Sequence, residues 1–110
     1  MKKSKVNVGD FFQQGDVIVR KIEVLPTNLK SLKHRVLAEG EVTGHCHQIV
    51  EKELSDLYCD EKGNLFLHVE KPVTLKHNTH NPITIPTGDY AIDNVIEYDH
   101  FAEEARKVRD

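Results

Sequence analysis

A chain of 110 residues with 38% apolar and 30% charged side chains has room for one hydrophobic core, which excludes a multidomain protein. Its formal net charge is −3, and its basic residues gather only in short groups at 2–5 and 30–35, which argues against a nucleic-acid-binding face. We expect one domain over residues 1–110, with 1–10 as a flexible or edge segment and 100–110 as a tail.

Cysteine usage and hydropathy predict a cytoplasmic protein. Cys46 and Cys59 are too few for a disulfide framework and are not spaced as a zinc knuckle. No apolar run reaches the roughly 18 residues that a membrane helix needs, and "MKKSKVNVGD" lacks the apolar segment of a secretory signal. We expect no membrane partner. A small molecule, another protein or a second copy of the chain are the partners that these features allow.

The first strand signal lies in "DVIVRKIEVL", Asp16–Leu25. This stretch is rich in Val and Ile and lies between Gly15 and Pro26, which predicts a strand. "TNLKSLK" then predicts a polar loop, in which Leu29 and Leu32 would also suit one helical turn.

The middle of the chain predicts two more strands and a hairpin. His34–Val42 is a strand weakened or bulged at Gly40, where the missing side chain allows a bend. His45–Leu54 is the next strand, and Leu57–Glu70 is a hairpin whose turn is "DEKGN". Apolar residues alternate along the second arm of that hairpin, which indicates one buried face: Leu65, Leu67 and Val69.

Further short strands follow in "PVTLKH" and "NPITIPTGDYAIDNVIEYD", separated by Asn-Pro and "PTG" turns. The tail "HFAEEARKVRD" predicts a short helix or an extended arm, because Glu103 lies at helical spacing from Arg106 and Lys107. In total we expect an all-β domain of about seven or eight short strands, built as a compact barrel or a β-sandwich.

The stretch "EGEVTGHCHQIVE" places two histidines one residue apart. Side chains alternate along a strand, so His45 and His47 would share one face and Cys46 would point to the other. Glu51 keeps the same parity if the strand continues unbroken. Two histidines and a carboxylate on one face form a set that suits ferrous iron and related divalent ions.

A second histidine pair lies in "KHNTHNP", at His77 and His80 before Pro82. Zinc accepts three or four histidine nitrogens, so the two pairs could share one ion if this turn folds over the strand. The predicted metal ligands are His45, His47, His77 and His80. Glu51 is the candidate catalytic residue, as a base or a further ligand. The ion would be zinc, iron, nickel or manganese. The alternative is that these histidines are solvated groups on an exposed strand face.

The spacing of Gly40, His45, His47 and Glu51 resembles the first cupin motif, in which a glycine precedes a His-x-His pair and a glutamate follows. "IPTGDYAI" resembles the Pro-x-Gly of the second cupin motif, but Ala91 stands where that family has a histidine. The resemblance implies a cupin-like barrel with a metal ion, in which a histidine of the second pair substitutes for the missing ligand.

The chain is also similar to a set of small bacterial and phage proteins. They share "QGDV", "LAEGEVTGH-x-H", "H-x-x-H-x-PI-x-(L/I)P-x-G-x-Y" and "EYD", which here fall at Gln14–Val17, Leu37–His47, His77–Tyr90 and Glu97–Asp99. This resemblance implies a stand-alone bacterial or phage domain and transfers no chemistry.

Three functions fit these patterns. The first is a small metal-binding β-barrel protein, with hydrolysis or oxygen chemistry as its possible reactions. The second is a non-enzymatic β-domain that acts in self-assembly or protein–protein interaction, with solvated histidines. The third, a nucleotide hydrolase of the histidine-triad kind, is disfavoured because Ile49 stands where "HCHQI" would need a third histidine.

Overall fold

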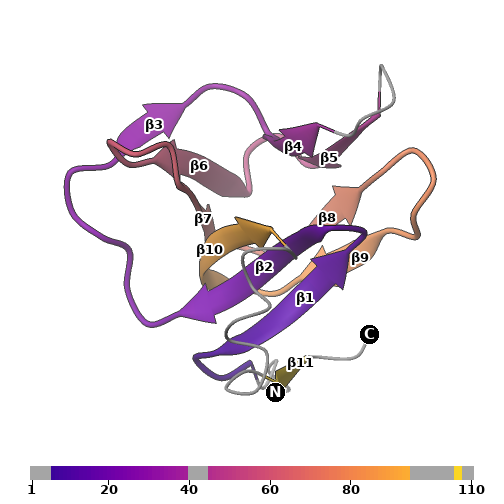
Figure 1. The fold of residues 1–110 in the computed structure, drawn as a ribbon, viewed down its shortest axis with the longest axis horizontal. Helices are drawn as coiled ribbons and strands as arrows, with labels where there is room; N and C mark the ends of the chain where they lie inside the picture. The colour runs from indigo at the N-terminus through magenta and orange to yellow at the C-terminus, as the bar shows by residue number, and fades with distance from the viewer. Residues whose placement is uncertain (1–5, 40–44, 95–105, 108–110) are drawn as a thin grey trace.

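The computed structural model describes residues 6–39, 45–94 and 106–107, and these form two β-sheets (Figure 1). The larger sheet has seven strands in the order β11-β1-β2-β10-β7-β6-β3. Their bounds are β1 Asp10–Gln14, β2 Val17–Ile22, β3 Lys30–Leu32, β6 Ser55–Cys59, β7 Leu65–Val69, β10 Gly88–Asn94 and β11 Arg106–Lys107. The smaller sheet has four strands in the order β4-β5-β8-β9. These are β4 Val36–Glu39, β5 Cys46–Ile49, β8 Val73–Lys76 and β9 Ile83–Ile85.

One hydrophobic cluster lies between the two sheets. Alternate residues turn inward in β7 and β8, so β7 contributes Leu67 and Val69 while β8 contributes Val73 and Leu75. The fully buried Tyr90 of β10 belongs to the same cluster. The all-β prediction is therefore confirmed, but the described strands form two open sheets and do not close into a cupin-like barrel.

Two strands lie where the sequence patterns predicted none. β1 precedes the predicted first strand, and its inward face carries two polar residues, Asp10 and Gln14, which are 4% and 3% exposed. β3 replaces the predicted polar loop or helical turn, because it pairs with β6. The predicted hairpin Leu57–Glu70 is confirmed by the pairing of β6 with β7.

Other predicted elements differ in extent. β5 ends at Ile49 instead of continuing to Leu54, and the register of β4 shifts between Val36 and Ala38. The bulge predicted at Gly40 lies outside the described residues.

The tail was predicted as a short helix or an extended arm, and where it is described it is extended and not helical. Arg106 and Lys107 form β11, which pairs in parallel with β1, and the other residues of 100–110 lie outside the described part. Within the described ranges there is no helix that could cross a membrane.

Tyr90 connects the core to the turn before β10. Its ring is fully buried and meets the ring of Phe12 edge-on, with centroids 6.3 Å apart. Its hydroxyl donates a hydrogen bond of 2.8 Å to the carbonyl oxygen of Pro86. Because a buried hydroxyl must keep a partner, this bond ties the β9–β10 connection to the core.

Replacing Tyr90 by Phe should lower the free energy of unfolding by about 1–2 kcal/mol, because the carbonyl of Pro86 loses its donor. The matched control is Tyr58→Phe, since the Tyr58 hydroxyl has no hydrogen-bond partner among the described residues. Urea denaturation followed by circular dichroism measures both changes. Equal losses in the two variants would contradict the assigned role of the Tyr90 hydroxyl.

Candidate functional site

Three segments that are far apart in sequence meet at one end of the molecule (Figure 1). They are the β1–β2 turn, the start of β5 and the β8–β9 connection. Antiparallel pairing explains the last two, because Gln48 and Ile49 of β5 pair with Lys76 and Leu75 of β8. The residues next along each strand, His47 and His77, are therefore neighbours across the sheet.

Four imidazole rings lie together at this point. The ring of His77 is central, with its centroid 4.3 Å from that of His47, 4.6 Å from that of His80 and 5.7 Å from that of His45. The rings of His47 and His80 are 6.0 Å apart and nearly parallel, at 17°. The structure thus brings "HCH" and "HNTH" side by side, although β5 begins only at Cys46, so that His45 lies just before the strand.

Hydrogen bonds hold the β8–β9 connection against both sheets. The side-chain oxygen of Asn78 accepts a hydrogen bond of 3.1 Å from the backbone N–H of Cys46 in β5. The carbonyl of Asn81 accepts one of 2.9 Å from the side-chain amide of Gln14 in β1. Within the connection, Nδ1 of His77 accepts the backbone N–H of Thr79 at 3.0 Å. The positions of His77 and His80 are therefore fixed by the backbone around them.

Gln14 determines the tautomer of His47. Both side chains are buried, at 3% and 2% exposure. The amide nitrogen of Gln14 donates to the carbonyls of Leu75 and Asn81, each at 2.9 Å, so its oxygen must face Nδ1 of His47, also at 2.9 Å. A flipped amide would direct its oxygen at two carbonyl oxygens. Because an amide oxygen only accepts, Nδ1 of His47 carries the proton and Nε2 keeps a free lone pair.

His47 is uncharged at neutral pH. Burial lowers its pKa from 6.5 to about 4, and the neighbouring His77 acts in the same direction. Asp16 raises it, but less, because its side chain is 70% exposed. Burial and then His80 also lower the pKa of His77. Imidazoles must be unprotonated to bind a metal ion, and the lowered pKa values of His47 and His77 favour that state for these two rings.

Gly15 allows the β1–β2 turn to approach the histidines. Its φ is +61°, and a Cβ there would lie 2.6 Å from Nε2 of His80 and 3.2 Å from Cε1 of His47. Only glycine fits so closely in this backbone conformation. The sequence patterns did not identify Gln14, Gly15 or Asp16 as site residues, although all three lie in the "QGDV" motif shared with the similar bacterial and phage proteins.

Glu51 lies apart from the rings. The predicted shared face required an unbroken strand, but β5 ends at Ile49. The two carboxylate oxygens of Glu51 accept hydrogen bonds from the backbone N–H and the hydroxyl of Thr74, at 2.8 and 2.9 Å. The backbone bond is the main reason why the pKa of Glu51 lies below its usual value. Its visible role is to fasten the chain after β5 to β8.

The other described histidines lie elsewhere. Nδ1 of His34 accepts the backbone N–H of Val36, and Nδ1 of His68 is 2.6 Å from a carboxylate oxygen of Asp89. His100 lies outside the described residues.

No three side chains of His, Cys, Asp or Glu in the described ranges have their donor atoms arranged to hold a metal ion as they stand. His77 in its neutral state also offers no free lone pair. Its Nδ1 accepts backbone N–H groups, so the neutral ring carries its proton on Nε2, where a metal ion would need a lone pair.

The low pKa of His47 should make stability depend on pH between 7 and 5. In this window the unfolded chain, with a pKa near 6.5, binds a proton that the native state, with a pKa of about 4, does not. The free energy of unfolding should therefore fall by about 2 kcal/mol from this group as the pH falls from 7 to 5. His47→Asn keeps a donor for Gln14 but cannot titrate, so the free energy of unfolding of this variant should depend less on pH.

His34→Asn is the control, because His34 is exposed and lies outside the site. Urea denaturation at each pH should give this variant the same dependence of unfolding free energy on pH as the original chain. Parallel curves for the original chain and His47→Asn would show that the native state does not depress this pKa.

Comparison with known proteins gives one family. No curated protein and no solved structure matches the chain. The match to a family covers residues 13–94, which include Gln14, His47 and His80. That family is described as a domain of unknown function, DUF8820, and the chain belongs to it.

Proposed function

We propose that this domain binds a divalent transition-metal ion at a site centred on Nε2 of His47. The observation that carries the proposal is a pair of acceptors that face each other. Nε2 of His47 has only a lone pair, and its charged neighbour is a carboxylate oxygen of Asp16 at 3.6 Å. Two acceptors repel unless a proton or a cation lies between them. A metal cation bound by both groups would satisfy the two acceptors at once, and the low pKa of His47 means that few protons compete for Nε2 at neutral pH.

His80 is the third group of the proposed set. Nε2 of His80 and Cε1 of His47 are both close to the position that a Cβ would take at Gly15. The two imidazoles therefore lie on the same side of the β1–β2 turn. The exposed side chains of His80 and Asp16 can rotate to bring their donors onto the ion, while His47 stays fixed by Gln14. Such rotamer changes are common on binding.

This set of two histidines and one carboxylate differs from the predicted four-histidine set. His77 would act as a hydrogen-bond donor from Nε2, and His45 would lie at the edge. A set of this kind suits ferrous iron and related ions and leaves positions for a substrate. Metal-dependent hydrolysis and oxygen chemistry are therefore the reaction classes that we propose for it.

Untagged protein exposed to iron(II), zinc, nickel or manganese and then desalted should retain one of these ions and show a higher melting temperature, because binding to the native state stabilises it. His80→Ala and Asp16→Asn alter exposed side chains and should keep the fold, yet each should weaken binding by at least about tenfold. His68→Ala is the control, since His68 pairs with Asp89 away from the site.

Less than about 0.2 ion per chain for all four metals, without thermal stabilisation, would contradict the proposal. It would favour the non-enzymatic alternative, in which the domain acts through protein contacts.

Gln14→Leu tests the role of the Gln14 amide, because it changes none of the proposed ligands but frees His47 to protonate Nε2 and removes the hydrogen bond that holds the connection carrying His80. Metal affinity should fall by about 10–100-fold, the usual effect of losing a group that orients a ligand. Gln13→Leu is the matched control, since among the described residues the amide of Gln13 bonds to the carbonyl of Gly15 and to no histidine. Isothermal titration of both folded variants measures the difference, and equal affinities would remove Gln14 from the account.

A further inference from the structure

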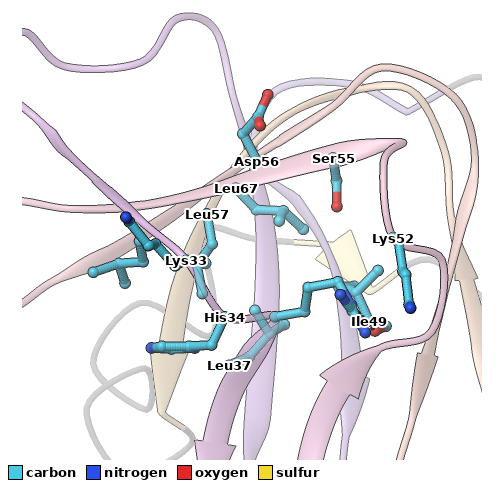
Figure 2. Close-up of a pocket in the computed structure, with 11 residues that line it drawn as sticks. Lys33, His34, Leu37, Ile49, Lys52, Ser55, Asp56, Leu57 and Leu67 are labelled. Carbon is cyan, nitrogen blue, oxygen red and sulfur yellow. Dashed lines mark hydrogen bonds between the residues drawn. The ribbon is translucent and has the colours of Figure 1, made fainter.

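A second candidate site lies beyond the other end of β5. A pocket of about 200 Å³ is bounded by the β3–β4 connection and by the segment that follows β5 (Figure 2). Its floor is aliphatic and comes from both sheets: Leu32, Leu37, Ile49, Leu57 and Leu67. None of the four clustered histidines lines it, so it is separate from the site described above.

The rim of this pocket is positively charged. Lys33, Arg35 and Lys52 all line it, and none of them has a carboxylate within ion-pair distance in the described part of the chain. The one carboxylate among the lining residues is that of Asp56. Strand alternation turns Asp56 away from the inward-facing Leu57, and Figure 2 shows its carboxylate directed away from Leu67. Among the described lining residues, no carboxylate directed into the pocket therefore neutralises these three cations.

Arg35 is held in place at this rim. Its Nε donates a hydrogen bond of 3.0 Å to the carbonyl of Ile49, and Arg35 as a residue is half-buried. The two terminal amino groups have no partner among the described residues. A fixed guanidinium fork matches the geometry of an oxyanion. Figure 2 also shows the hydroxyl of Ser55 and the side chain of Lys52 on the same side of the pocket.

The size of the pocket restricts its ligand. A volume of about 200 Å³ is smaller than a site for a drug-sized molecule and corresponds to roughly six or seven water molecules. Three like charges around so small a space repel one another, and a bound anion would offset that repulsion.

We propose that this pocket binds a small oxyanion of phosphate size, either free phosphate or the phosphoryl group of a small ester. Arg35 supplies the directed donors, and Lys33 and Lys52 supply charge. This inference does not rest on the proposed metal site.

An NMR titration tests it, with sodium phosphate added at an ionic strength held constant by sodium chloride. Backbone amide signals of residues 33–35 and 52–56 should shift and saturate. Lys52→Gln should weaken the binding by roughly two- to fivefold, the range for an exposed ion pair. Arg35→Lys keeps the charge but removes the fork, and it should also weaken binding. Lys71→Gln is the control, because it removes the same charge from an exposed residue outside the pocket.

Glycerol phosphate in a parallel titration distinguishes the two sources: tighter binding than that of phosphate assigns the site to an ester, and weaker binding assigns it to the free ion. Shifts that stay linear with concentration, that chloride reproduces, or that are the same in Lys52→Gln and Lys71→Gln would overturn the proposal. His80→Ala should leave the titration unchanged, so the failure of one site is distinguishable from the failure of the other.

Discussion

The three hydrogen bonds of the Gln14 side chain are the interaction on which the site depends. Gln14 lies on β1 of the seven-stranded sheet, and its partners are Leu75 of β8, Asn81 of the β8–β9 connection and His47 of β5. One buried amide therefore links the two sheets and positions the connection that carries His77 and His80. The need to satisfy the buried amide makes this arrangement specific, since only this orientation of Gln14 gives its nitrogen two acceptors and its oxygen a donor.

The same hydrogen bonds determine which nitrogen of His47 can bind a cation. By accepting a hydrogen bond from the Nδ1–H of His47, the amide oxygen of Gln14 leaves that ring with a lone pair at Nε2, in a place where burial keeps the ring neutral. Asp16 then faces that lone pair across 3.6 Å. A structural histidine in a core normally has both nitrogens satisfied, whereas this one has an acceptor opposite an acceptor. That conflict, together with the close approach at Gly15, is why we interpret the cluster as a cation site.

Two candidate sites lie at the two ends of β5, one suited to a cation and the other to an anion. At the start of β5, the neutral ring of His47 and the carboxylate of Asp16 suit a cation. Past its end at Ile49, Lys52, Arg35 and Lys33 surround a small pocket that suits an anion. The short length of β5 matters here, because the chain leaves the sheet after Ile49 and is fastened to β8 by Glu51, which places Lys52 at the rim.

Local patterns could predict the all-β class and the Leu57–Glu70 hairpin, because both follow from side-chain alternation and turn residues. They missed β1, since its inward-facing Asp10 and Gln14 are polar and the hydrogen-bond partners of the buried Gln14 are distant in sequence. They assigned Glu51 to the histidine face by assuming that β5 was longer than it is. The role of Gln14 could not be predicted, because its contact with His47 spans 33 positions and depends on a tautomer.

The central claim is that native His47 is a neutral imidazole with its proton on Nδ1, and NMR correlation of the histidine ring nitrogens with their carbon-bound protons tests it most directly. At pH 7 and without metal, the His47 signals should show a protonated Nδ1 and an unprotonated Nε2. A signal pattern with the proton on Nε2, or that of a charged ring, would contradict the account.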